Sequence, residues 1–194
     1  MFKKCLILVW EFLKVVAISL AIIIPVRYFL IQPFYVKGAS MESTFHDHEY
    51  LIIDEISYRF HPIVRGDVVV FRYPLDPQEY FIKRVIGLPG ESVQIKDGQV
   101  IIYNEQNPGG LVLKENYLDV SAPTYSNNDN KVALGADEYF VLGDNRTASK
   151  DSRAFGPVNR SFITGHVWLR GWPFNRAAIF NKSVDYSAAS QVKN

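Results

Sequence analysis

The segment Ser92-Val93-Gln94-Ile95-Lys96-Asp97-Gly98-Gln99-Val100-Ile101-Ile102-Tyr103 decides the fold class of this chain. Two runs rich in Val and Ile flank Asp97-Gly98, and a two-residue Asp-Gly loop supplies the positive φ angles that a type I′ hairpin turn requires. The segment therefore predicts a β-hairpin with strands over 92–96 and 99–103.

Similar short runs lie on both sides of this hairpin. They are rich in Val, Ile, Phe and Tyr, are bounded by Pro, Gly and Asp, and predict strands over Tyr50–Ile56, Asp67–Tyr73, Tyr80–Ile86, Glu138–Leu142 and His166–Arg170. Polar, turn-forming residues dominate 104–110 and 121–130. We therefore expect a mainly β, antiparallel domain over 32–180, with a smaller inserted β-hairpin and loop subdomain over about 91–136, and a polar tail over 181–194.

The N-terminus has a different pattern. Lys3 and Lys4 precede a run from Cys5 to Val26 that is almost wholly apolar, and about 20 apolar residues suffice for a membrane-spanning helix. Glu11 and Lys14 are three residues apart, so they share a helical face and partly neutralise each other. We expect residues 1–31 to form a single membrane anchor, which Pro25 kinks or ends.

The orientation follows from the lysines, whose excess before the apolar run favours a cytoplasmic N-terminus and an extracytoplasmic β domain. The alternative is a cleavable signal peptide, which ends in a small-x-small site. No such site follows Val26 directly, and the nearest small residues, 38–40, belong to the stretch that we consider functional. We therefore expect the anchor to be retained.

Composition limits the remaining possibilities. The chain has 194 residues, 48% of them hydrophobic and 21% charged, with a net charge of +1, which indicates one ordinary domain plus an anchor and excludes disordered and coiled-coil classes. The near-zero charge gives no sign of a nucleic-acid partner. Cys5 is the single cysteine, so no intrachain disulfide can form. We expect a monomer with no cofactor and no metal.

Ser40 is the candidate nucleophile, because Gly38 and Ala39 deliver it flanked by small residues soon after the apolar run. A serine attacks at neutral pH only when a base takes its proton and donors receive the oxyanion. Histidine is the usual base, but no supporting signature accompanies any of the four, and no Gly-x-Ser-x-Gly elbow surrounds Ser40. His46-Asp47-His48 offers two imidazoles without a third metal ligand, so a surface turn is the favoured interpretation.

Lys83 is the other candidate base. Strand alternation places it with Phe81 and Val85 on one face, while Ile82 and Arg84 share the other. Burial among apolar neighbours would lower the pKa of the amine and make it a neutral base. Spacing alone favours the alternative, an edge-strand lysine with its amine in solvent.

Four segments, in this order, resemble the type I signal peptidases, which are membrane-anchored serine proteases with a Ser-Lys dyad. They are Gly38–Glu42, Arg65–Phe71, Lys83–Gly90, and Gly143–Arg146 with Ser149 and Asp151–Arg153. The resemblance covers about 15–172 and is weakest over about 104–136. Two departures are Ser43, where the family usually has proline, and Thr147-Ala148, where an Asp-Asn pair is more frequent.

The resemblance implies the roles of particular residues. Ser40 would be the nucleophile, Lys83 its general base, and Ser149 the residue that hydrogen-bonds and orients the lysine. The Ser40 N–H would be one oxyanion donor, whereas Gly38 stands where some members carry a serine hydroxyl, so the second donor is open. Met41 would help to bind substrate.

The resemblance also implies two bracing ion pairs, Arg84 with Asp144 and Arg153 with Asp151. The substrates would be signal peptides of exported preproteins, cut after Ala-x-Ala sites at the surface of the lipid bilayer. Two alternatives stay in view. A self-cleaving Ser-Lys regulator would carry a DNA-binding helical domain, which nothing before Ser40 resembles; a tethered, non-catalytic β domain would typically have lost Ser40 or Lys83.

Overall fold

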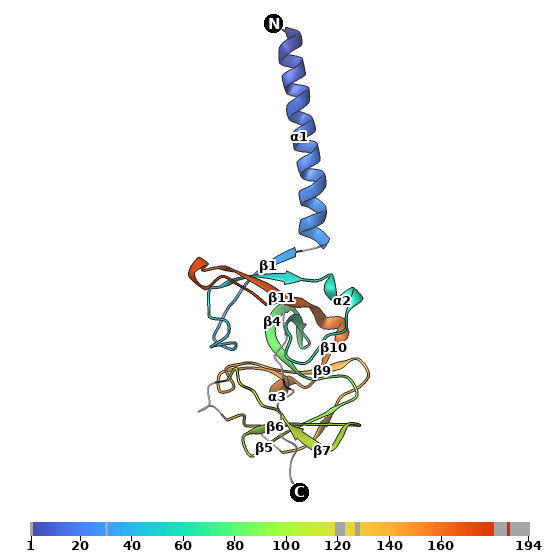
Figure 1. Ribbon diagram of the computed structural model, residues 1–194, viewed down its shortest axis with the longest axis vertical. Helices are drawn as coiled ribbons and strands as arrows, with labels where there is room; N and C mark the ends of the chain where they lie inside the picture. Colours follow the sequence, from blue (N-terminus) through green and yellow to red (C-terminus); the bar gives the residue numbers. More distant parts are fainter. Residues whose placement is uncertain (1, 30, 119–122, 127–128, 181–185, 187–194) are drawn as a thin grey trace.

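The computed structural model describes residues 2–29, 31–118, 123–126, 129–180 and 186, and it consists of one long helix followed by a β body (Figure 1). Helix α1 spans Phe2–Phe29. By length and composition its segment Lys3–Ile24 can cross a membrane, and most large apolar side chains of that segment are exposed. The helix continues past Pro25, as proline is tolerated inside membrane-spanning helices.

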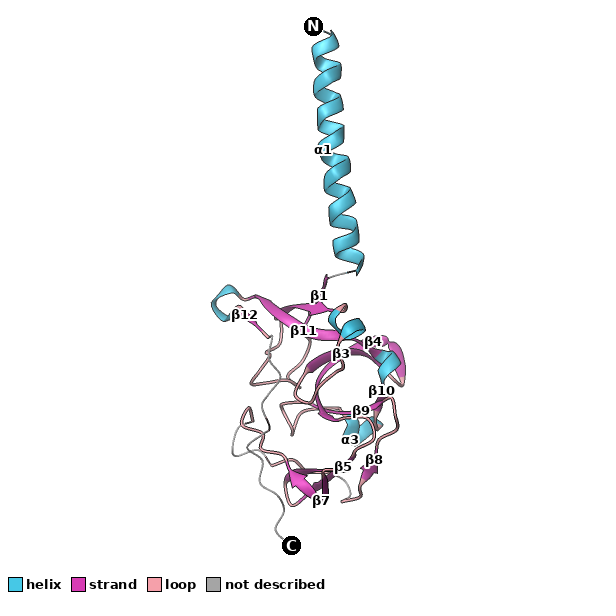
Figure 2. Cartoon of the chain, turned by 45° about the vertical axis from the view of Figure 1, so that its right-hand side comes forward, coloured by secondary structure: helices cyan, strands magenta, loops and turns pink. Residues whose placement is uncertain are grey.

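The larger sheet is antiparallel and has eight strands, in the order β1-β2-β11-β3-β4-β9-β10, with β12 paired to β11. These strands are β1 (Ile31–Tyr35), β2 (Tyr50–Asp54), β3 (Val68–Tyr73), β4 (Asp76–Gly87), β9 (Glu138–Leu142), β10 (Val158–Asn159), β11 (Ile163–Trp172) and β12 (Ala178–Ile179). Short helical turns join some of them: α2 (Ser57–Phe60), α3 (Ser152–Phe155), η1 (Arg160–Phe162) and η2 (Phe174–Arg176). Figure 2 shows the sheet curling back on itself rather than lying flat.

The second sheet has four strands in the order β7-β6-β5-β8 and lies at the end of the body far from α1 (Figure 1). Its strands are β5 (Ser92–Lys96), β6 (Gln99–Asn104), β7 (Asn107–Val112) and β8 (Val132–Ala133). The turn between β5 and β6 has positive φ at both Asp97 and Gly98, as the Asp-Gly signal predicts. The mainly β, antiparallel fold with one N-terminal apolar helix is therefore confirmed.

The two sheets share a hydrophobic core. Ile86 of β4 and Phe140 and Leu142 of β9 pack with apolar residues of the second sheet, including Val93 and Ile102. The second sheet therefore packs on β4, which carries Lys83, and on β9, which leads to Asp144. The division of the chain into an anchor, a catalytic domain and an inserted subdomain remains a prediction, and the predicted polar tail lies outside the described residues except for Tyr186.

Candidate active site

Ser40 lies in a single turn of chain between β1 and β2. The N–H of Phe45 donates to the carbonyl of Met41 at 2.8 Å, which closes the turn. Met41 is 1% exposed and Phe45 is fully buried, so both pack into the core beside Leu51 and Ile53. Because this face is buried, the turn presents Ser40 at the opposite side, toward β4 and the loop after β9.

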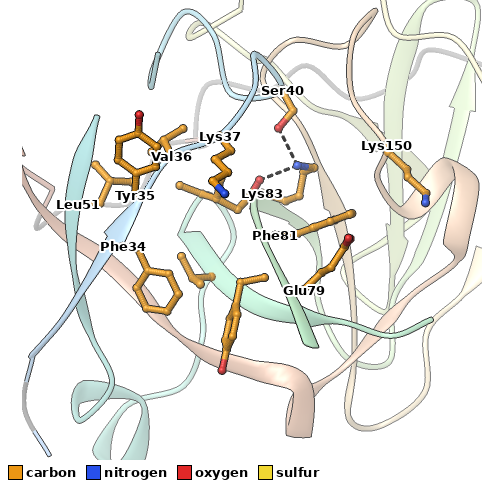
Figure 3. Close-up of a pocket in the computed structure, with 13 residues that line it drawn as sticks. Phe34, Tyr35, Val36, Lys37, Ser40, Leu51, Glu79, Phe81, Lys83 and Lys150 are labelled. Carbon is orange, nitrogen blue, oxygen red and sulfur yellow. Dashed lines mark hydrogen bonds between the residues drawn. The ribbon is translucent and has the colours of Figure 1, made fainter. Parts of the chain in front are cut away.

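Lys83 reaches Ser40 from β4. Its Nζ forms hydrogen bonds with Ser40 Oγ and with the carbonyl oxygen of Ile82, both at 2.7 Å (Figure 3). Lys83 is only 4% exposed, and Nζ lies 5.3 Å from the centroid of the Phe81 ring. The alternative of a lysine with its amine in solvent is therefore excluded.

The electrostatic environment of Lys83 suits a base. Burial lowers the pKa of Lys83 from 10.5 to about 8, while the charges of Asp151 and Asp144 act in the opposite direction. A substantial fraction of such a lysine is neutral near neutral pH, and the neutral amine has the lone pair that a serine proton requires.

The other side of the site is the loop that follows β9. The N–H of Asn145 donates to the carbonyl oxygen of Ser40 at 3.1 Å. A side chain at Gly143 would overlap both this carbonyl oxygen and the hydroxyl of Ser149. The loop can therefore approach the serine turn closely only with glycine at position 143.

Both predicted ion pairs form. Arg84 binds Asp144 through Nε at 2.8 Å and Nη2 at 2.6 Å, and Arg153 binds Asp151 through Nε and Nη2, both at 2.8 Å. Burial disfavours charge on Asp151, but the hydrogen bonds and charge of Arg153 outweigh it and lower the pKa of Asp151. The Gly143 N–H also donates to Asp151, at 3.1 Å, so this pair supports the loop.

Ser149 does not make the contact with Lys83 that the resemblance implies, and the backbone N–H of Gly38 is bound within its own loop. The Ser149 hydroxyl is buried beside Gly143 and Asp151 and makes no hydrogen bond to Lys83, whose amine bonds to Ser40 and Ile82 instead. The Gly38 N–H is taken by Asp47 Oδ1 at 2.9 Å. The Gly38 N–H could bind an oxyanion only after its hydrogen bond to Asp47 breaks.

A cleft of about 500 Å³ opens beside Ser40 and Lys83 (Figure 3). Its walls are mostly apolar and aromatic, and come from β1, β2, β3 and β4: Phe34, Tyr35, Val36, Leu51, Val70, Tyr80, Phe81 and Ile82. Lys37, Glu79 and Lys150 add charges at its edge. The four histidines do not belong to this lining; His46, for example, lies 3.6 Å from Glu42.

Three polar residues near the site were not predicted to belong to it. The Thr44 hydroxyl donates to Asp144 Oδ2 at 2.6 Å, the Tyr117 ring lies 4.2 Å from the Arg84 guanidinium carbon, and Arg146 pairs with Glu115. Two of them carried a signal in the sequence: Thr44 lies four residues after Ser40 in the same turn, and Arg146 ends one of the segments that resemble the signal peptidases.

Comparisons with known proteins agree on one family. The family model described as signal peptidase, peptidase S26, matches residues 9–172. A signal peptidase I of Leptolyngbya laminosa is 40% identical over 174 residues, which cover 86% of this chain and 81% of that protein. A signal peptidase IB of Staphylococcus aureus is 32% identical over 176 residues, covering 85% and 90%.

A solved structure is also similar. The crystal structure of a signal peptidase I from Enterococcus faecalis V583 has 32% sequence identity to this chain and covers 55% of it and 97% of its own chain, with a TM-score of 0.45.

The matches define the class as serine peptidases. Within that class the chain belongs to the signal peptidase family, peptidase S26, and its enzyme type is signal peptidase I. Its substrates are accordingly preproteins that carry signal peptides, and its apolar N-terminal helix fits a membrane-anchored protein.

Proposed function

We propose that this chain removes signal peptides by a Ser-Lys dyad, with Ser40 as nucleophile and Lys83 as general base, and that it cuts after small-x-small sites such as Ala-x-Ala. The observation that carries the proposal is the 2.7 Å hydrogen bond between a buried Lys83 Nζ and Ser40 Oγ at the floor of an open cleft.

The first half of the reaction forms an acyl-enzyme. Neutral Lys83 takes the Ser40 proton while Oγ attacks the scissile carbonyl carbon, and the carbonyl oxygen becomes an oxyanion that the Ser40 N–H stabilises. The Lys83 ammonium then gives its proton to the leaving amine, the peptide C–N bond breaks, and the mature protein departs with a free N-terminus.

The second half releases the signal peptide. Lys83, neutral again, takes a proton from water, whose oxygen attacks the ester carbonyl and forms a second tetrahedral intermediate. Collapse of this intermediate returns the proton to Ser40 Oγ and frees the signal peptide with a carboxylate end. The low pKa of Lys83 matters in both halves, because the amine accepts and donates one proton in each.

Two unpaired strand edges support recognition of an extended substrate. Among the described strands β1 pairs only with β2, and the part of β4 before Arg84 pairs only with β3. The edges face each other across the cleft, where the rings of Phe34 and Tyr80 are 5.3 Å apart. An extended peptide can hydrogen-bond to such edges while alternate side chains enter pockets, and shallow apolar pockets admit small side chains and reject bulk by overlap.

The end of the body nearest α1 supports action at a membrane surface. Strand β11 and the turn that follows it lie toward that end (Figures 1 and 2), and Trp172 and Phe174 there are 49% and 77% exposed. Tryptophan is enriched at membrane interfaces. We propose a cytoplasmic N-terminus, a single span and an extracytoplasmic β domain that acts as a monomer against the bilayer.

The test is cleavage of a preprotein with one Ala-x-Ala site by the detergent-solubilised full chain, followed by mass spectrometry of the products. We expect one cut after the second Ala, no cut by Ser40→Ala or Lys83→Ala, and normal cleavage by Ser43→Ala, which removes an exposed hydroxyl from the same turn. Normal cleavage by Ser40→Ala would refute the nucleophile, and normal cleavage by Lys83→Ala would refute the base.

A further inference from the structure

A threonine with no role in the reaction described above ties the nucleophile turn to the structure around the base. Thr44 lies four residues after Ser40, in the turn closed by the Phe45 N–H and the Met41 carbonyl. Met41 and Phe45 enter the core, whereas Ser40 and Thr44 meet the loop after β9.

Adjacent residues of that loop hold the two ends of the turn. The Asn145 N–H donates to the Ser40 carbonyl oxygen at 3.1 Å, and Asp144 Oδ2 accepts the Thr44 hydroxyl proton at 2.6 Å. The second distance is typical of a charge-assisted O–H···O⁻ bond, which is about twice as strong as a neutral hydrogen bond. Hydrogen bonds to two adjacent residues, Asp144 and Asn145, therefore hold both ends of the turn that carries the nucleophile.

Asp144, which accepts this hydrogen bond, is itself held in place. The Asp144 side chain is 1% exposed and is held by two hydrogen bonds from Arg84, the residue next to Lys83 on β4. Arg84 Nη1 also donates to the Gly66 carbonyl at 2.8 Å, which fixes the guanidinium against the backbone just before β3. A chain of contacts thus runs from the base strand through Arg84 and Asp144 to Thr44 and the nucleophile turn.

We propose that Thr44 is a positioning residue, whose hydroxyl, bound to the Arg84–Asp144 pair, sets the distance between Ser40 Oγ and Lys83 Nζ. Thr44 does not belong to the lining of the cleft, so its effect should fall on the chemical step and not on substrate binding. Small misplacement of a nucleophile can slow a reaction about a hundredfold, and the turn keeps its buried Met41 and Phe45 anchors without Thr44. We therefore expect an intermediate effect.

The inference rests on the proposed Ser-Lys mechanism, and Thr44→Val tests it because valine keeps the shape of threonine and removes the hydroxyl. We expect kcat to fall about tenfold, KM to stay within about twofold, and the melting temperature to fall by only a few degrees, as the loss of one hydrogen bond requires. Thr44→Ser, which restores the hydroxyl, should recover most of the lost kcat, and Ser43→Ala should match the wild type. An unchanged kcat, a loss confined to KM, or Thr44→Ser behaving like Thr44→Val would overturn the inference.

Hydrogen exchange of the Phe45 amide separates this inference from the proposed function. Its N–H closes the turn, so in the full-length protein we expect it to exchange at least about tenfold faster in Thr44→Val and near the wild-type rate in Thr44→Ser. If the exchange rates follow this pattern but the wild-type protein cleaves no preprotein, the peptidase mechanism is refuted, while the role of Thr44 in holding the turn stands. Equal exchange in all three proteins would refute that role whether or not cleavage occurs.

Discussion

Cleavage should depend steeply on pH, because Lys83 must be neutral before it can accept the Ser40 proton. Burial lowers the pKa of Lys83 from 10.5 to about 8, although Asp151 and Asp144 oppose the shift. A pKa of about 8 leaves roughly one Lys83 in ten neutral at pH 7, whereas 10.5 would leave roughly one in three thousand. Burial thus provides about 300-fold more active base at neutral pH.

The assay is kcat/KM for an Ala-x-Ala peptide from about pH 6 to about pH 10 at constant ionic strength. The value should rise about tenfold for each pH unit below 8 and level off above it, since kcat/KM reports groups of the free enzyme. Circular dichroism over the same range is the control for unfolding. An inflection near about 6.5, the ordinary pKa of histidine, would refute a lysine base. An inflection near 10.5 would refute the effect of burial.

Further predictions concern stability, the ion pair and topology. Because the folded pKa of Lys83 lies below its unfolded value, the unfolded chain binds more protons between about pH 8 and 10.5, and stability should rise with pH there. Lys83→Met should therefore raise the melting temperature at pH 7 by several degrees. The free energy of unfolding should increase by about 3 kcal/mol, less the contribution of the hydrogen bonds that Lys83 makes. The difference in stability from the wild type should vanish toward pH 10.5, and a difference that stays constant with pH would refute the lowered pKa of Lys83. Asp144→Ala leaves the buried Arg84 guanidinium without its carboxylate and should lower the free energy of unfolding in urea by about 3–5 kcal/mol. Adding Arg84→Lys should not restore this loss, because a buried ammonium would lack a carboxylate partner in the same way. Cys5, the single cysteine, should react with a membrane-impermeant maleimide only after cells are permeabilised. Lys96→Cys in a Cys5→Ser background should react in intact cells. The reverse pattern would refute the proposed topology.

Local patterns were sufficient to predict much of the fold. Strand β9 and strand β5 begin and end where alternation and turn residues place them, and the strands predicted over 80–86 and 166–170 lie inside the longer β4 and β11. Strands β1 and β7 were not predicted, because Pro33 interrupts the first and Pro108 with two glycines interrupts the second. Pairing with β2 and β6 overrides these weak local preferences.

The site was predictable only in part. The order of the motifs pointed to Ser40 and Lys83, and the structure brings these two side chains together. Thr44 and Asp144 are 100 residues apart in sequence, and Tyr117, which stacks on Arg84, comes from the segment that looked like a polar insertion. Such contacts arise when separate segments pack together, so no local periodicity or spacing encodes them.

The Ser-Lys mechanism is tested most directly by the intact mass of the protein after acid quench of a reaction with an activated ester that ends in Ala-x-Ala, followed by peptide mapping. We expect one added acyl group on Ser40, no acylation of Ser40→Ala, and acylation slowed by at least about a hundredfold in Lys83→Ala, the lower end of what a general base contributes. Acylation of another residue would refute Ser40 as the nucleophile, and acylation of Ser40 at the normal rate in Lys83→Ala would refute Lys83 as the base.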